Sequence, residues 1–164
     1  MCSEMPTFES GKMIRVLIAD DNQLMRNGLS LLLARTGDIQ VVGQARDGKE
    51  TVALAKELCP DVILMDIRMP GVSGLDAVRE IRRENGKVPI LILAMAYDAP
   101  LVHRAFESGA SGFIAKHEFV VDLVPGVRAV HAGQKYQSPS VVEELALHGD
   151  PVEYGEVRFD RMPS

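Results

Sequence analysis

The sequence predicts an α/β protein built on a doubly wound, five-stranded parallel sheet with helices on both faces. Short apolar segments alternate five times with longer segments of helical period, which is the pattern of repeated strand–helix units. Acidic residues directly follow the first and third apolar segments, and a lysine follows the fifth. The chain has 164 residues, of which 46% are hydrophobic and 25% charged, so it is large enough for one such domain and a short extension.

The five expected strands are apolar almost throughout, as strands are when a sheet is covered on both faces. They cover Ile14–Ala19, Ile39–Ala45, Asp61–Met65, Ile90–Met95 and Gly112–Ala115. The helices are expected over Gln23–Arg35, Gly48–Leu58, Leu75–Glu84, Pro100–Ser108 and Val120–His131. Asn22 is a suitable cap for the first helix, since its side chain can accept a hydrogen bond from the first turn. The spacing of Leu24, Gly28, Leu31 and Leu32 predicts one face of this helix.

Three carboxylates are expected to meet at one edge of the sheet. Asp20 and Asp21 end the first strand and Asp66 follows the third, and the carboxyl ends of parallel strands form the edge where ligands bind. Lys116 follows the fifth strand and reaches the same edge. Neighbouring carboxylates repel one another unless a cation compensates them, and oxygen ligands favour Mg²⁺ or Mn²⁺. These residues therefore predict a metal-assisted site.

Any one of these aspartates could instead be a helix cap or a solvated loop residue. Their joint occurrence with Lys116 at the ends of three strands favours a site. A carboxylate beside Mg²⁺ and a lysine can attack a phosphoramidate, because both cations neutralise charge on the phosphoryl oxygens. Asp66 would then carry an acyl phosphate.

Three segments of the chain resemble the signature segments of response-regulator receiver domains, in particular those of the NarL/FixJ subgroup. They are Ala19–Asn22, Leu64–Gly71 and Gly109–Lys116, and the resemblance covers about residues 13 to 135. It implies a flavodoxin-like (βα)5 fold with strand order 2-1-3-4-5. It also implies a role in two-component signalling, in which the phosphoryl group comes from a phosphohistidine of a sensor histidine kinase or a phosphotransfer protein.

The resemblance assigns a role to each residue of the expected site. Asp66 would be the phosphoacceptor, and Lys116 would contact a phosphoryl oxygen. Asp21 and Asp66 would bind Mg²⁺ directly, Asp20 would support the ion through water, and Arg68 would add its backbone carbonyl. The protein would catalyse its own phosphorylation and dephosphorylation but would not be an enzyme in the ordinary sense.

One position departs from the family pattern. Receiver domains normally have Thr or Ser at the end of the fourth strand, where its hydroxyl binds the phosphoryl group, and the matching residue here is Ala94. Phe113 matches the aromatic switch position on the fifth strand. The missing donor predicts that phosphorylation persists while its coupling to the surface of the fourth and fifth strand–helix units is blunted. The alternative is that Ala94 is a tolerated variant without consequence.

Residues 1–12 are expected to form a tail, residues 13–135 the receiver domain, and residues 136–164 a short extension. Ser138-Pro139-Ser140 predicts a helix over 139–148, followed by a flexible tail. The extension is too short and too acidic for a helix-turn-helix domain. The net charge of −5 and the lack of a basic stripe also argue against direct binding of nucleic acid.

Competing functions remain open at this stage. The chain could be the receiver half of a truncated transcription factor, or an interaction module that works without phosphorylation, which only Ala94 supports. A hydrolase of external phosphomonoesters ranks lowest, because no second acid–base residue accompanies Asp66 by motif. No long apolar run or secretion signal is present, so a cytoplasmic protein without membrane contact is expected. Homodimer formation is left open.

Overall fold

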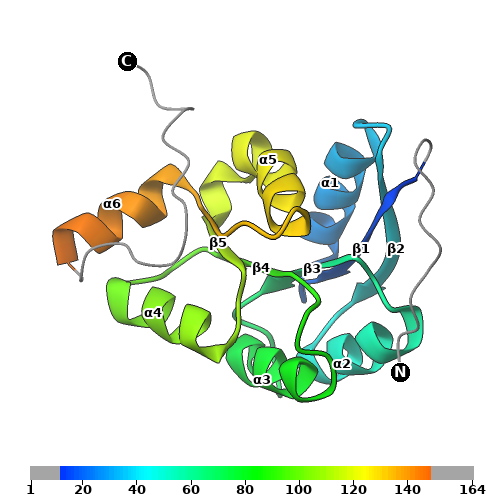
Figure 1. Cartoon of the computed structure of the whole chain (residues 1–164), viewed down its shortest axis with the longest axis horizontal. Coiled ribbons are helices and arrows are strands. Elements are labelled where there is room, and N and C mark those ends of the chain that lie inside the picture. The colour runs from blue at the N-terminus through cyan, green and yellow to red at the C-terminus, as the bar shows by residue number, and fades with distance from the viewer. Residues whose placement is uncertain (1–11, 149–164) are drawn as a thin grey trace.

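The computed structural model describes residues 12–148, which form a parallel sheet between two layers of helices (Figure 1). The strands are β1 (Ile14–Ala19), β2 (Ile39–Ala45), β3 (Val62–Asp66), β4 (Ile90–Ala94), β5 (Gly112–Ala115) and β6 (Tyr136–Gln137). They lie in the order β2-β1-β3-β4-β5-β6, and every neighbouring pair is parallel. The predicted parallel α/β fold is therefore confirmed.

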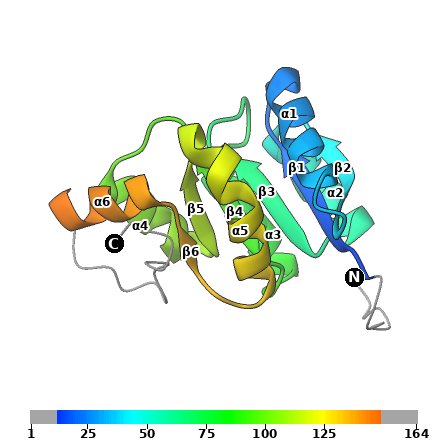
Figure 2. The ribbon, with the colours of Figure 1, turned by 90° about the horizontal axis from the view of Figure 1, so that it is seen from above.

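The helices cover both faces of this sheet (Figures 1 and 2). They are α1 (Gln23–Ala34), α2 (Gly48–Leu58), α3 (Gly74–Glu84), α4 (Ala99–Ser108), α5 (Phe119–His131) and α6 (Pro139–His148), with a short 3₁₀ turn η1 (Lys116–Glu118). Residues of α1 and α5 share one apolar core with the sheet, and residues of α3, α4 and α6 share the other. Each predicted element is present, with its ends within one residue of the expected positions.

The prediction of five strands was wrong, because β6 adds a sixth strand beside β5. The backbone N–H groups of Tyr136 and Ser138 donate to the carbonyls of Ser111 and Phe113. The Tyr136 ring is fully buried, and its hydroxyl donates to Asp122 on α5 at 2.5 Å. Strand β6 has only two residues, too few to show a periodic pattern in the sequence. Its extended conformation depends instead on these contacts with β5 and α5.

The predicted helix over 139–148 is confirmed as α6. The Ser138 hydroxyl, just before this helix, accepts a hydrogen bond from the Ala115 N–H at 2.9 Å. Val141 and Leu145 are fully buried in the core that includes α4 and β5, so α6 is held on this side of the sheet. The boundary expected at residue 135 stays a prediction, and the tail expected after residue 148 lies outside the described residues.

Helix α1 begins as predicted, because the Asn22 side chain accepts a hydrogen bond from the Met25 N–H. Its buried face differs from the predicted one. Leu29 and Leu33 are fully buried, whereas Leu24 and Leu31 are 79% and 70% exposed. The helix is so rich in leucine that two stripes of helical spacing are available, and packing on the sheet selects one of them. Among residues 12–148 no helix is long and apolar enough to cross a membrane.

Candidate functional site

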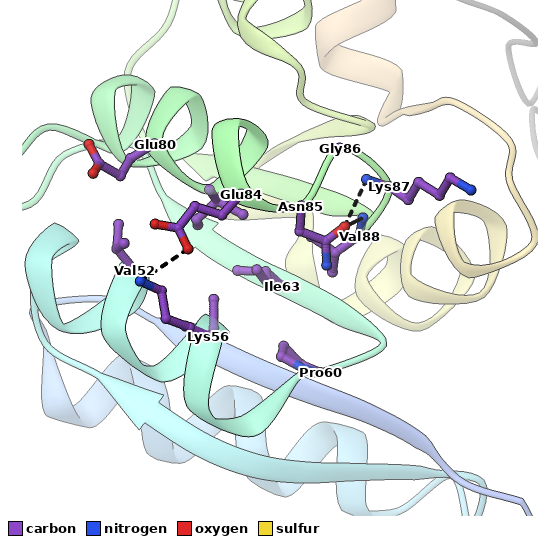
Figure 3. A pocket seen from close by; sticks show the side chains of 12 residues that line it. Val52, Lys56, Pro60, Ile63, Glu80, Glu84, Asn85, Gly86, Lys87 and Val88 are labelled. Carbon is purple, nitrogen blue, oxygen red and sulfur yellow. Dashed lines mark hydrogen bonds and ion pairs between the residues drawn. The ribbon is translucent and has the colours of Figure 1, made fainter. Parts of the chain in front are cut away.

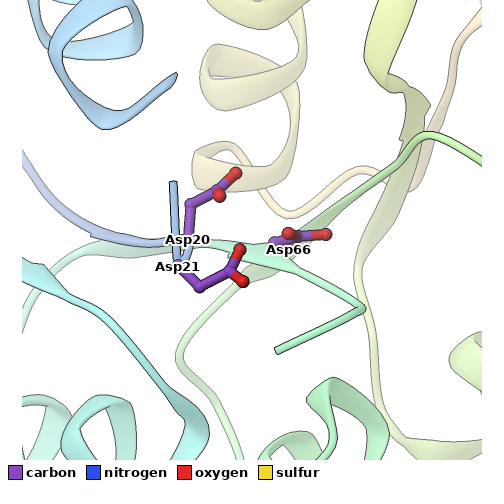
Figure 4. Close-up of side chains that lie close together, drawn as sticks. All are labelled: Asp20, Asp21 and Asp66. Carbon is purple, nitrogen blue, oxygen red and sulfur yellow. The ribbon is translucent and has the colours of Figure 1, made fainter. Parts of the chain in front are cut away.

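The carboxyl ends of β1 and β3 bring Asp20, Asp21 and Asp66 together (Figure 4). Ala19, the last residue of β1, pairs with Met65 on β3. Asp20 and Asp21 follow Ala19, and Asp66 follows Met65, so the three aspartates meet at one edge of the sheet. One carboxylate oxygen of each lies within 4.8 Å of the others. Asp20 and Asp66 are buried, and Asp21 is exposed. Three carboxylates at this spacing suit a hard divalent cation that reaches the site from solvent past Asp21.

Lys116 supplies positive charge to this cluster from the end of β5. Its Nζ lies 2.8 Å from Asp20 Oδ2 and 3.3 Å from Asp66 Oδ2. The Lys116 side chain is only 11% exposed and the Asp20 side chain 1%, so the ion pair is largely shielded from solvent. The sequence prediction that Lys116 joins the aspartates at one edge agrees with this geometry.

The loop between β3 and α3 holds Asp66 from its other side. The Arg68 N–H donates to Asp66 Oδ1 at 3.2 Å, and Gly74 N–H donates to the Ile67 carbonyl at 3.0 Å. A Cβ at Gly74 would lie 2.7 Å from Ile67 Cα and 2.9 Å from the Asp66 carbonyl oxygen, so the loop closes this tightly only around glycine. That the Arg68 carbonyl binds a metal stays a prediction.

Burial, together with the nearby Asp20 charge, raises the pKa of Asp66 above its ordinary value of 3.8, and the Arg68 N–H and Lys116 oppose the rise. Burial alone would lower the pKa of Lys116, but its bonds and ion pairs with Asp20 and Asp66 outweigh burial and raise that pKa. The cluster therefore disfavours the charged form of Asp66 when Lys116 is its only cation. A divalent cation at this site would favour the charged form of Asp66. The charged form would in turn bind the cation more tightly than the protonated form would.

The raised pKa of Asp66 predicts how stability changes with pH when no divalent cation is bound. Wild-type stability should fall as pH rises through this pKa, because the folded protein holds the proton more tightly than the unfolded chain does. Asp66→Asn removes that loss, so the variant should be more stable than wild type by on the order of 1 kcal/mol at about pH 8. The gain should shrink at about pH 4, near the ordinary pKa of 3.8, where the unfolded chain also takes up the proton. Urea unfolding at both pH values with chelator present checks this, and a gain that grows toward acid pH would contradict it.

Ala94 and Phe113 lie on the fourth and fifth strands, as predicted from the sequence. Ala94 ends β4, is fully buried and pairs with Ala115, the residue before Lys116. Phe113 is fully buried on β5, and its ring makes an edge contact with Tyr97, with 5.7 Å between ring centroids. Their roles in switching stay predictions.

Sequence reasoning missed a group of contacts between α6 and the loops beside the site. Glu118, two residues after Lys116, accepts hydrogen bonds from the Ser140 N–H at 3.2 Å and the Ser140 hydroxyl at 2.7 Å. Glu144 accepts one from the Ala99 N–H at the start of α4, at 3.3 Å. Helix α6 is thus tied to the segments that follow both β4 and β5. The only signal in the sequence was Ser138-Pro139-Ser140, which indicated a cap and no long-range partner.

Comparison with known proteins points to one family. The family model of the response regulator receiver domain matches residues 16–127 of the chain. Response regulator GacA of Pseudomonas viridiflava is 38% identical over 148 residues, which are 90% of this chain and 69% of GacA. Response regulator UvrY of Escherichia coli is 36% identical over 135 residues, which are 82% of this chain and 62% of UvrY. The chain thus spans only part of the length of these relatives.

A solved structure agrees with the sequence matches. The crystal structure of a LuxR-family two-component response regulator from Aurantimonas is similar, with a TM-score of 0.80 and 34% identity. The match covers 83% of this chain and 97% of that one. These relatives bear out the resemblance to the NarL/FixJ subgroup, as does the flavodoxin-like order of the first five strands. The chain belongs to the response regulator receiver domain family of two-component signalling.

Proposed function

We propose that Asp66 accepts a phosphoryl group from a phosphohistidine of a sensor histidine kinase or a phosphotransfer protein. The observation that carries the proposal is the meeting of Asp20, Asp21, Asp66 and Lys116 at one edge of the sheet. A cluster of carboxylates with one shielded lysine is arranged for binding a cation and a phosphoryl group together. The cytoplasm is the compartment we propose, since the donor must meet the chain there.

In the proposed reaction an Asp66 oxygen attacks the phosphorus in line with the phosphorus–nitrogen bond. That bond breaks as the new oxygen–phosphorus bond forms, and its electron pair returns to the imidazole nitrogen. The Lys116 ammonium lies 3.3 Å from Asp66 and would bind a phosphoryl oxygen, while the Arg68 N–H keeps the carboxylate oriented. Asp21 and Asp66 would hold Mg²⁺ or Mn²⁺, with Asp20 acting through water and Arg68 through its carbonyl. The ion would neutralise charge on the phosphoryl oxygens.

We propose that the output passes through the face formed by α4, β5 and α6. Helix α6 is hydrogen-bonded to the segment after β5 through Glu118, and to the start of α4, after β4, through Glu144. A shift of either loop on phosphorylation would change these bonds. A partner protein, or a further domain of a longer chain, would then read the position of α6. Homodimer formation and the absence of direct nucleic-acid binding stay predictions.

A test of the phosphoacceptor is intact mass after incubation with phosphoramidate and Mg²⁺. Wild type and Asp76→Asn, a control at an exposed carboxylate on α3, should gain one phosphoryl group, and Asp66→Asn should gain none. Chelation of Mg²⁺ should lower uptake by wild type by several orders of magnitude. No adduct on wild type would favour an interaction module that works without phosphorylation. Rapid turnover of a simple phosphomonoester would favour the hydrolase.

A further inference from the structure

Three neighbouring hollows follow α3 and α4 and the loops beside them, and cations line each of the three. The hollow nearest the site is lined by Arg68 and Arg104, and the next by Arg104, Arg79, Arg82 and Arg83. The third is lined by Arg82, Lys87 and Lys135. Arg104 lines the first two hollows and Arg82 the last two, so neighbouring hollows share a cationic wall. We call this feature the basic trench.

The positive charge of the basic trench is only partly compensated. Arg68, Arg104 and Lys87 form no ion pair within residues 12–148. The ion pairs of Arg79 with Asp76 and of Arg83 with Glu80 are exposed and span one helical turn, which makes them weak and easily exchanged. The trench lining includes only two carboxylates, Asp98 and Glu107.

Arg82 and Lys135 show the same excess of positive charge. Arg82 is half-buried and donates to the Gly109 and Asn85 carbonyls at 3.0 and 3.2 Å, so neutral acceptors are its partners. Burial lowers the pKa of Lys135, and repulsion by Arg82 lowers it further. A bound anion would relieve this repulsion.

The opposite side of α3 has a different character (Figure 3). The groove between α2 and α3 is lined by Glu80 and Glu84, and Lys56 pairs with Glu84 at 3.1 Å. It lies beside Pro60 and Val88, which precede β3 and β4, and so at the sheet edge away from Asp66. Its charges are balanced by residues of the chain itself. Lys56 and Lys87 line this groove together with Glu80 and Glu84, so its cations are matched by carboxylates, whereas the hollow between α3 and α4 has four arginines and one carboxylate.

We propose that the basic trench binds an extended acidic segment of a partner protein, through carboxylates that pair with Arg79, Arg83 and Arg104. Guanidinium groups bind carboxylates in a two-pronged geometry that lysine does not offer. The chain as a whole has a net charge of −5, so a nucleic acid longer than the trench would meet repulsion from the rest of the surface. A short acidic peptide would meet only the trench. The proposal does not depend on phosphorylation of Asp66.

A binding assay with a defined probe tests the proposal. The probe is a fluorescein-labelled peptide of about ten residues, rich in Glu, which reaches over roughly 33 Å when extended. Anisotropy titrations with the full chain at low salt compare wild type with Arg79→Gln/Arg83→Gln/Arg104→Gln. The matched control is Arg35→Gln/Arg46→Gln/Lys49→Gln, which removes three exposed cations outside the trench. The trench variant should raise Kd about 10-fold or more, and the control less than about 2-fold.

The same titration contains the outcomes that would overturn the proposal. Equal weakening by both triple variants would show that only net charge matters. No binding of the Glu-rich peptide to wild type would remove the surface as an acidic-peptide site. Tighter binding of a single-stranded DNA of similar charge would identify a nucleic-acid surface instead. A peptide in which Gln replaces Glu should not bind, and binding of it would also contradict the proposal.

Discussion

Lys116→Ala should lower the free energy of unfolding by about 3 kcal/mol or more at about pH 8 when no divalent cation is present. The substitution removes the only lysine within hydrogen-bonding distance of Asp20 and Asp66 among the described residues. Asp20 is fully buried and pairs with Lys116, so the substitution would leave its carboxylate in a poorly solvated place without its lysine partner. Urea unfolding in chelator measures the loss. The loss should shrink toward acid pH, where Asp66, whose pKa is raised, takes up a proton.

Mg²⁺ should return part of this stability, because the ion would replace the positive charge of Lys116 beside the carboxylates. Mg²⁺ should not restore the rate of phosphoryl uptake by Lys116→Ala. We expect that rate to be about 10²- to 10³-fold below wild type, because the variant lacks a donor to the phosphoryl oxygen in the transition state. Lys56→Ala is the matched control, since Lys56 also pairs with a carboxylate but both side chains are about half exposed. It should cost less than about 1 kcal/mol. Equal losses for both variants would show that Lys116 does not compensate a buried cluster.

The first five strands, the helices and the edge of the sheet that carries the site could all be predicted from the sequence, because each depends on local patterns. Strands buried on both faces are apolar throughout, and connections between parallel strands place their carboxyl ends at one edge. Asp20 and Lys116 directly follow such strands, and Asp66 is the last residue of one. Their convergence therefore required only the order of the elements and no knowledge of packing.

What the sequence did not reveal depends on contacts between distant residues. Strand β6 exists through the bonds of Tyr136 and Ser138 to β5, and the Glu118–Ser140 contact joins residues 22 apart. The basic trench was missed in the same way, since the sequence shows no basic stripe. Its cations come from α3, α4 and the loops after β3, before β4 and after α5, and only the fold gathers them.

Ala94→Thr should increase the coupling between phosphorylation and α6. A threonine hydroxyl at the end of β4 would add a hydrogen bond to the charged phosphoryl group, worth about 1.5–3 kcal/mol. That corresponds to roughly a 10- to 150-fold shift toward the switched state. The route runs from β4 through the loop that ends at Ala99, whose N–H bonds Glu144 on α6. Hydrogen exchange of residues 139–148 with and without a phosphoryl group on Asp66 measures the shift.

In wild type we expect phosphorylation to change the protection of α6 only slightly, and in Ala94→Thr we expect a large loss of protection. Ala94→Val is the matched control, because valine has the shape of threonine without its hydroxyl. If valine released α6 as well, crowding at this fully buried position would be the cause and the hydrogen bond would not. If neither variant differed from wild type, Ala94 would be a tolerated variant, and the switch would depend on Lys116 and the metal ion. Because both variants keep Asp66 and Lys116, the rate of phosphoryl uptake should change much less than the protection of α6. That contrast separates the chemistry of the site from its coupling to α6.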